Sequence, residues 1–392
     1  MIRRIAGAAS GLTLILAGTA YAAGPAAAGQ QAAVTPPTVY VANAPLSSGG
    51  SVTPIDSATN KAGTAISVGM DPVDIAVTPD GTTAYVANNA DGTVTPIATA
   101  TSTAGPAIVI GESADAIAVT PDGTTAYVVD TADGTVVPID VATQTAGAAI
   151  KVGKEPNDIA ITPDGATAYV LNRGSGTVTP ITIATNTAGP AIKTGGKPLA
   201  LAITPDGSTV YVANDGSGTV TPITTATNTA GPAIKVGKDP YGIAVTPNGK
   251  KAYVVSLGAG TAKSPGGVTP IATATNTPGK MIKAGVSPEA IAMTPNGKTA
   301  YVASVGPGTG GQAGIGVTPI TVATNKPGKL IATGGTPGLV AITPDGKTVY
   351  AVNVILGGDQ EKSTVTPITV AGNTAGTPIK VGDNPGAIAI TP

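Results

Sequence analysis

The stretch that decides the fold is residues 74–97, which read DIAVTPDGTTAYVANNADGTVTPI and return in variant form along most of the chain. Short segments rich in Val, Ile, Tyr and Thr are typical of strands. The Pro-Asp-Gly at residues 79–81 is typical of a tight turn, because Pro presets φ and Gly accepts a positive φ. The stretch predicts three consecutive antiparallel strands, and residues 107–110 predict a fourth.

The repeat sets the architecture. Its central Tyr recurs at intervals of 42 residues in the middle of the chain and of 45 to 49 residues nearer the ends. A unit of four strands and this length is typical of a propeller blade. The sequence therefore predicts an all-β protein, a single β-propeller with eight blades; a ring of seven blades, with a terminal copy outside it, is the alternative. The eight copies of the Tyr are Tyr40, Tyr85, Tyr127, Tyr169, Tyr211, Tyr253, Tyr301 and Tyr350.

The two ends of the repeat array predict how the ring closes. The array begins in a second strand, residues 38–43, and its last segment, residues 387–391, is a first strand. Pairing the C-terminal strand with the N-terminal blade leaves no open sheet edge. We expect a signal peptide at residues 1–22, a flexible linker at 23–36 and the propeller at 37–392.

The motifs Tyr85-Val86-Ala87-Asn88, Thr78-Pro79-Asp80-Gly81 and Gly92-Thr93-Val94-Thr95-Pro96-Ile97 resemble the YVTN-type β-propeller repeat. The resemblance covers residues 38–392 and implies the propeller fold, in a family of secreted and surface proteins of bacteria and archaea. It implies no single activity, because propellers host many. One departure is the Pro in every third strand, where we expect a bulge or a missing hydrogen bond, because Pro has no N–H to donate.

The composition excludes several chemistries. The chain has 54 Gly and 35 Pro, ten Tyr, and no His, Cys, Trp or Phe. Without His or Cys there is no Ser-His-Asp triad, no Cys nucleophile and no site that holds zinc or haem iron through these residues. On this ground we expect a chain that is not an enzyme and has no cofactor, with Ca²⁺ or Mg²⁺ held by carboxylates as the open alternative.

The start of the chain predicts export. Arg3 and Arg4 precede the apolar run 5–20, and Ala20-Tyr21-Ala22 fits a cleavage site, so the mature protein is expected to begin at Ala23. The lysines, roughly one or two per repeat, do not indicate a nucleic-acid surface. We expect a monomer without a membrane span after cleavage, secreted or attached to the cell surface.

Candidate site residues follow from where the repeats differ. The loops between second and third strands lengthen at residues 44–50, 256–267, 304–316 and 353–364, and acids stand just before several first strands. In a propeller both sets open on one face, so they are expected to border a central depression. The eight repeated Tyr are expected to pack between blades. The predicted ligand-binding face comprises Asp74, Asp115, Asp158, Tyr241, Glu289, Lys263, Gln312, Asp359 and Glu361.

Three functions fit these features. The preferred hypothesis is an exported, non-catalytic scaffold that recognises a protein or glycan of the cell envelope through the long-loop face. The first alternative resembles propeller lactonases and lyases, with a metal and acid–base groups in the central channel. The second alternative is a structural component of a surface layer.

Overall fold

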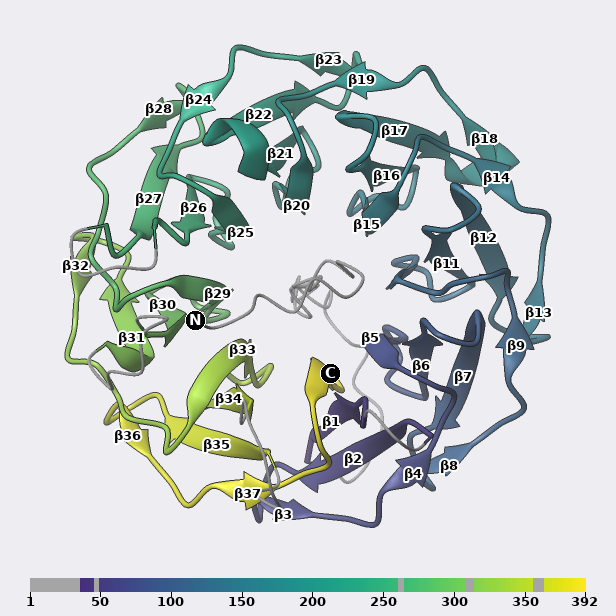
Figure 1. Cartoon of the computed structure of the whole chain (residues 1–392), viewed down its shortest axis with the longest axis horizontal. Coiled ribbons are helices and arrows are strands. Elements are labelled where there is room, and N and C mark those ends of the chain that lie inside the picture. Colours follow the sequence, from purple (N-terminus) through teal and green to yellow (C-terminus); the bar gives the residue numbers. More distant parts are fainter. Residues whose placement is uncertain (1–35, 46–48, 260–263, 307–313, 355–362) are drawn as a thin grey trace, which may run out of the picture.

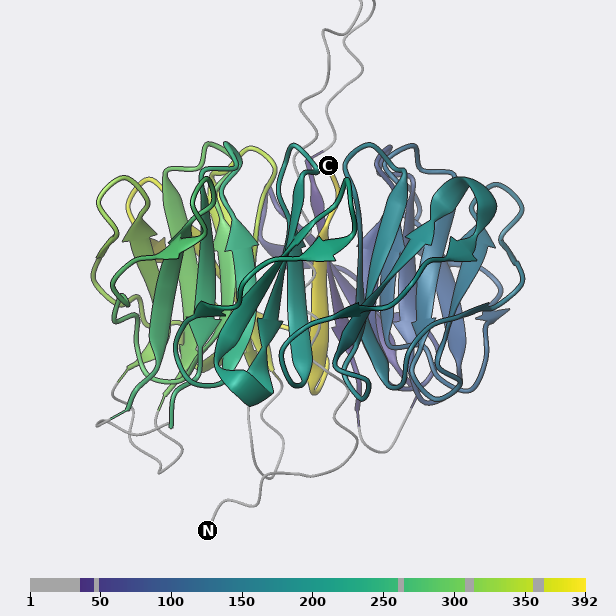
Figure 2. The same cartoon turned by 90° about the horizontal axis from the view of Figure 1, so that it is seen from above.

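The computed structural model describes residues 36–45, 49–259, 264–306, 314–354 and 363–392. They form eight antiparallel blades in a ring (Figure 1), whose central axis we call the channel, and the strands run roughly along that axis (Figure 2). The predicted eight-bladed β-propeller is confirmed, and the seven-bladed alternative is wrong. No helix in the described ranges is long and apolar enough to cross a membrane.

The innermost strands line the channel, and we number the blades by them from 1 to 8. In that order they are β38 (Pro385–Ile390), β5 (Pro72–Val77), β10 (Ala116–Val119), β15 (Pro156–Ile161), β20 (Pro198–Ile203), β25 (Pro240–Val245), β29 (Pro288–Met293) and β33 (Thr336–Ile342).

The second strands carry the repeated Tyr. They are β1 (Thr38–Asn43), β6 (Thr83–Asn88), β11 (Thr125–Asp130), β16 (Thr167–Asn172), β21 (Thr209–Asn214), β26 (Lys251–Ser256), β30 (Thr299–Val305) and β34 (Thr348–Val354).

The third strands carry the repeated Pro. They are β2 (Ser51–Asp56), β7 (Thr93–Ala98), β12 (Thr135–Asp140), β17 (Thr177–Thr182), β22 (Thr219–Thr224), β27 (Gly267–Ala272), β31 (Ile315–Thr321) and β35 (Thr364–Thr369).

The outermost strand consists of two pieces, where the sequence predicted a single strand, residues 107–110 in blade 2, after a turn. The first pieces are β3 (Lys61–Ala62), β8 (Thr103–Ala104), β13 (Thr145–Ala146), β18 (Thr187–Ala188), β23 (Thr229–Ala230), β28 (Thr277–Pro278), β32 (Lys326–Pro327) and β36 (Thr374–Ala375). The second pieces are β4 (Ile66–Ser67), β9 (Ile108–Val109), β14 (Ile150–Lys151), β19 (Ile192–Lys193), β24 (Ile234–Lys235) and β37 (Ile379–Lys380); in blades 6 and 7 single bridges at Ile282 and Ile331 replace them. Two short 3₁₀ turns, η1 (Ile183–Thr185) and η2 (Asp215–Ser217), complete the elements.

The repeated Pro lies opposite this break. In blade 2, Pro96 pairs with Tyr85 without any register shift, so the expected bulge is absent. The Pro96 carbonyl accepts a bond from Gly105 N at 2.8 Å and therefore points outward. The nitrogen of the same residue points the same way, between β8 and β9, so its missing N–H costs the ladder with β6 nothing.

Adjacent blades are joined by the repeated Tyr. Each ring is buried, and in six blades its hydroxyl donates to an Asn in the outer turn of the next blade, as from Tyr127 to Asn186 at 2.6 Å. The bond from Tyr350 to Asn60 at 2.7 Å crosses the junction between blades 8 and 1. The expected packing role of these residues is confirmed.

The ring closes within blade 1, as predicted. There β38 pairs with β1, for example Ile388 with Val41, and Thr391 N donates to the Thr38 carbonyl at 3.0 Å. Val39 and Leu339 belong to one apolar cluster that joins blades 8 and 1. The junction is thus held by the same strand pairing and packing as the other blades.

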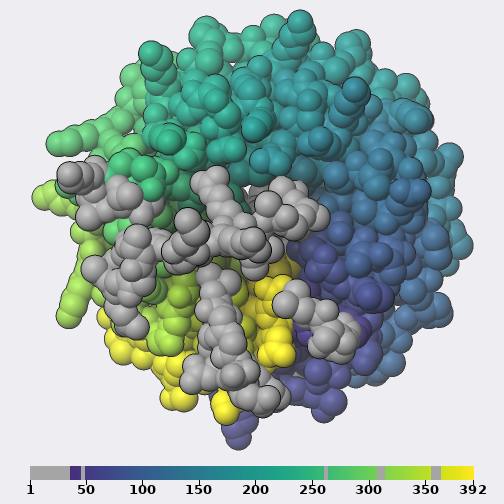
Figure 3. Space-filling model, in the orientation of Figure 1, coloured from purple at the N-terminus to yellow at the C-terminus, as the bar shows by residue number. Residues whose placement is uncertain are grey.

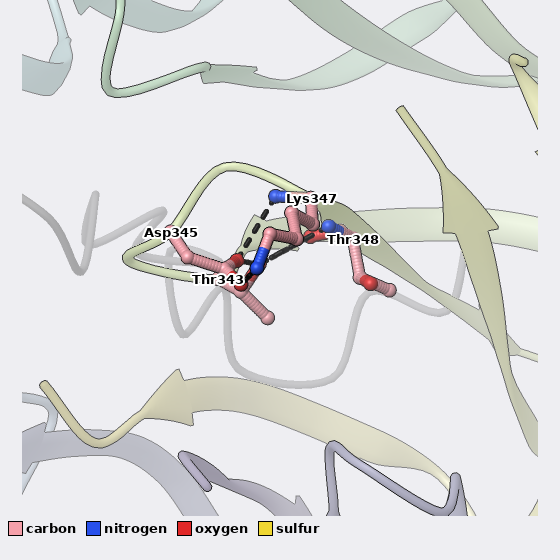
Figure 4. A network of polar contacts seen from close by, with 4 residues as sticks. All are labelled: Thr343, Asp345, Lys347 and Thr348. Carbon is pink, nitrogen blue, oxygen red and sulfur yellow. Dashed lines mark hydrogen bonds and ion pairs between the residues drawn. The ribbon is translucent and has the colours of Figure 1, made fainter. Parts of the chain in front are cut away.

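The turn between first and second strands is built by its own side chains. In blade 8, Thr343 Oγ1 donates to Asp345 Oδ1 at 2.6 Å, and Thr348 N donates to Thr343 Oγ1 at 3.1 Å (Figure 4). Lys347 adds a backbone bond and an ion pair of 3.1 Å to the same carboxylate. The Asp of the Thr-Pro-Asp-Gly motif therefore serves the turn, as expected.

Candidate functional site at the channel mouth

The second-to-third loops and the connections that lead into the inner strands lie on one face. Backbone bonds join them: Asn89 N donates to the Asp71 carbonyl and Arg173 N to the Glu155 carbonyl, both at 2.9 Å. This supports the predicted mouth of the channel for the described parts of these loops.

Most inner strands are preceded by a non-glycine residue with a positive φ. In blade 2, Asp71 has φ of 53° and Pro72 follows it, and a register shift separates Pro72 from Asp74. A non-glycine residue in the left-handed region is uncommon and often marks a functional part of a protein. The shared residues with positive φ are Asp71, Glu155, Lys197, Asp239, Ser287 and Asn384.

Asp74 and Asp158 stand at the same register, in blades 2 and 4, and both are buried. Asp74 accepts bonds from Ile75 N at 2.8 Å and from Ile117 N of the next blade at 2.9 Å. Asp158 accepts in the same way from Ile159 N at 2.8 Å and from Leu201 N of blade 5. These carboxyls satisfy backbone donors on the open inner edge of the strands, so their role is structural.

Burial governs the ionisation of both groups. Burial raises the pKa of Asp158 to about 8 and the pKa of Asp74 well above its ordinary value. The backbone hydrogen bonds act in the opposite direction and lower both pKa values. The Asp158 charge adds to the raised pKa of Asp74. Desolvation thus outweighs hydrogen bonding at this wall.

Asp115 differs from the other two, although the sequence pattern grouped the three. Blade 3 has Ala114 where the other blades have Pro, and β10 pairs with β11 without a shift. The register of β10 is that of the other blades, because Ala116 pairs with Val129 as Asp74 pairs with Ala87, and Asp115 stands one residue earlier in its repeat than Asp74 does. Its carboxylate accepts from Asn89 Nδ2 at 2.9 Å and from Ser113 Oγ at 2.9 Å, and burial raises its pKa.

Tyr241 and Glu289 occupy, in blades 6 and 7, the same position of the repeat as Asp115 does in blade 3. Each stands one residue after the Pro of its inner strand. Both side chains are partly exposed. Glu289 Oε2 lies 3.7 Å from the point where a Cβ on Gly338 of blade 8 would stand, so its carboxylate reaches along the wall toward that blade. Burial raises the pKa of Glu289 to about 7.

Arg173 is a site residue that sequence reasoning left out. It starts the second-to-third loop of blade 4, and its buried Nε has no hydrogen-bond partner in the described structure. Burial raises the pKa of Tyr241 most, Glu289 and Asp215 raise it further, and Arg173 lowers it. The charges of Glu289 and Arg173 therefore both act on the Tyr241 phenol. The available signal was that Arg173 is the one Arg after residue 4.

The predicted face is thus partly assembled. Five predicted residues lie at the inner wall, and among them Tyr241 and Glu289 are linked by an electrostatic effect, to which Arg173 also contributes. Lys263, Gln312, Asp359 and Glu361 lie outside the described residues. Within the described ranges no group of three or more Asp, Glu, His or Cys side chains is placed to hold a metal. A Ca²⁺ or Mg²⁺ site made of Asp74, Asp115 and Asp158 therefore has no support.

Residues 75–233, less than half of the chain, match the family described as "Lactonase, 7-bladed beta-propeller". This chain has eight blades, and the match includes Arg173 but ends before Tyr241. No curated protein matches the sequence. The match supports a propeller and not the YVTN family in particular.

Solved structures share the fold. Hydrazine synthase of Kuenenia stuttgartiensis has 23% identity and a TM-score of 0.59, covering 80% of this chain and 96% of that one. A functionally unknown protein from Desulfotomaculum acetoxidans DSM 771 has 17% identity and a TM-score of 0.63, covering 90% and 98%. Dihydro-heme d1 dehydrogenase NirN, in complex with DHE, has 14% identity and a TM-score of 0.74, covering 94% and 78%.

These findings overturn the expectation that the chain is not an enzyme. The matched family is one of lactonases, and a similar fold belongs to a dehydrogenase. Missing His and Cys exclude only the chemistries that need those residues. The channel mouth still presents a carboxylate, a phenol and a guanidinium, which suffice for proton transfer and for stabilising an anion.

Proposed function

We propose that the protein is a lactone hydrolase whose site is the channel mouth at blades 4, 6 and 7. The observation that carries the proposal is the electrostatic effect of Glu289 and Arg173 on Tyr241, in a chain that matches a lactonase family over residues 75–233. The proposal takes the place of the non-catalytic scaffold. It keeps the channel site of the first alternative without requiring a metal.

Glu289 is the general base. Its pKa of about 7 leaves a substantial carboxylate fraction at neutral pH with enough basicity to accept a proton from water. The water oxygen attacks the lactone carbonyl as Glu289 takes its proton. The ring C–O bond then breaks, and the proton passes to the leaving alkoxide. Lactone and water give one hydroxy acid, and Glu289 returns as carboxylate.

Arg173 and Tyr241 stabilise the charge that develops on the carbonyl oxygen. The strongly raised pKa of Tyr241 keeps its phenol protonated as a donor. The partnerless Nε–H of Arg173 supplies a charged donor that needs no reorganisation. A buried donor without an acceptor costs the folded protein about 1–3 kcal/mol, a cost that a bound oxyanion relieves.

The test is hydrolysis of a panel of γ- and δ-lactones by the purified protein, followed by acid release. We expect activity that rises with pH to a plateau, with its midpoint near the Glu289 pKa of about 7. Glu289→Gln should lower kcat by about 10²- to 10⁴-fold. The matched control is Glu155→Gln, an exposed acid on the same face that should leave kcat unchanged. No hydrolysis of any lactone, or equal loss in both variants, would overturn the proposal.

A further inference from the structure

The charges of the chain are unevenly distributed around the ring. Eleven of the 22 acids precede residue 151, but only one of the 18 lysines, Lys61, does so. The lysines are therefore concentrated in the later repeats. This corrects the even spread of roughly one or two per repeat that we expected from the sequence. Because sequence order is ring order, blades 4 to 8 carry most of the positive charge (Figure 1).

The uneven distribution of charge is most pronounced on the outer wall of the ring. We define the outer basic wall as residues 177–193, 219–235, 267–283, 315–331 and 364–380, the third and outermost strands of blades 4 to 8. These residues include seven lysines and no acid, and all seven are exposed. Long side chains stand out from the circumference of the green blades in Figure 3. The lysines are Lys193, Lys235, Lys280, Lys283, Lys326, Lys329 and Lys380.

None of these lysines is neutralised within the described structure. The ion pairs found in the described ranges join Lys238 to Asp239 and Lys347 to Asp345, both outside the wall. The outer strands of blade 2, residues 93–109, carry no charge at all. The chain therefore keeps a local basic surface although its net charge is −1.

Protection of strand edges does not account for the wall. Charged side chains, Lys especially, keep an edge from pairing with another chain. A purely protective role would be needed in every blade, yet the outer strands of blade 2 carry no charge. Blades 6 and 7 also carry two lysines each, as in the pair Lys280 and Lys283. The single sign indicates an anionic partner.

We propose that the outer basic wall binds a linear acidic polysaccharide that runs along the circumference of the ring. The wall is convex and extends over five adjacent blades, so a flexible chain can follow it, whereas a flat membrane would touch only one or two blades. It has Lys but no Arg and no aromatic residue. Single-stranded nucleic acids are held by exposed aromatic rings and Arg, which the wall lacks.

A hollow next to the wall fits this ligand. It has a volume of about 290 Å³ and lies between blades 3 and 4, lined by Lys151, Ser175, Thr177 and Thr179 among others. Hydroxyls beside one ammonium group suit a sugar residue that carries an acidic substituent. The hollow extends the basic wall by one position into blade 3.

The test uses a fluorescently labelled, heparin-derived oligosaccharide and anisotropy at 50 and 200 mM salt. The protein should bind at low salt and weaken with added salt, because each ammonium–anion contact releases counterions. The triple variant Lys193→Gln, Lys235→Gln, Lys283→Gln should weaken binding about tenfold or more. The matched control, Lys197→Gln, Lys250→Gln, Lys298→Gln, removes the same charge from exposed positions off the wall and should change affinity about twofold at most.

Four outcomes would overturn the proposal. They are no binding at 50 mM salt, equal loss in the two triple variants, tighter binding of single-stranded DNA of equal charge, and recruitment to anionic vesicles that the oligosaccharide fails to displace. Because the substituted side chains are exposed, both triple variants should keep the thermal unfolding temperature of the parent. Lactone hydrolysis is measured on the same samples and is expected to stay unchanged, which separates this test from that of the catalytic site.

Discussion

The two halves of the channel wall use the same residue types for different purposes. In blades 2 and 4, the oxygens of Asp74 and Asp158 accept bonds from backbone N–H groups of their own and the next blade. In blades 6 and 7, Tyr241 and Glu289 are partly exposed and are linked to Arg173 by charge. An acid whose acceptors are filled by backbone donors maintains the fold. One that is partly exposed and linked by charge to a phenol is available for chemistry.

The largest expected effect is on catalytic activity, which should be lost in variants of one half of the wall and kept in variants of the other. Glu289→Gln should lower kcat/KM for lactone hydrolysis about 10²- to 10⁴-fold, because the base is lost. Asp158→Asn keeps an acceptor for the backbone and should change kcat/KM about threefold at most. Steady-state kinetics on both variants checks this. Equal losses would mean that the two halves form one catalytic unit.

The second effect concerns stability and pH. The pKa of Asp158 is about 8 in the folded protein, above the ordinary value near 4 expected for the unfolded chain. Its contribution is therefore complete below about pH 4 and is lost as pH rises through about 8. The free energy of unfolding should decrease over this window, and Asp158→Asn should flatten the decrease. Urea unfolding from pH 4 to 9 measures it; a parent curve that is flat or rises contradicts the assignment.

The smallest effect probes blade 3, where the acid belongs to neither half. Ser113 Oγ lies 2.9 Å from Asp115 Oδ2 and 3.1 Å from Asp130 Oδ1, so its hydroxyl bridges two carboxylates. Ser113 Oγ also accepts a hydrogen bond from Ala132 N at 3.1 Å. Ser113→Ala should lower the free energy of unfolding by about 1–2 kcal/mol. Ser175→Ala in the blade 4 loop is the control. A larger loss of unfolding free energy in this variant than in Ser113→Ala would refute the bridging role of Ser113.

Several features of the site were accessible from the sequence because they follow from local spacing. The acids before the inner strands and Tyr241 stand at the predicted wall. Asp115 was misplaced because it stands one residue earlier in its repeat than Asp74, at the position of Val73, so its side chain has different neighbours. Arg173 was passed over because its charge acts on Tyr241 from two blades away, which sequence spacing does not show.

The sequence by itself determined the eight blades, the turn chemistry and the closure by the last strand. Strand alternation and turns are set by neighbouring residues, and repetition makes each signal unmistakable. Only the tertiary structure decided which polar groups meet. Partners such as Asp158 and Leu201 belong to different blades, and desolvation depends on the whole ring around them. The outer basic wall likewise exists only once five separate repeats are arranged around one circumference.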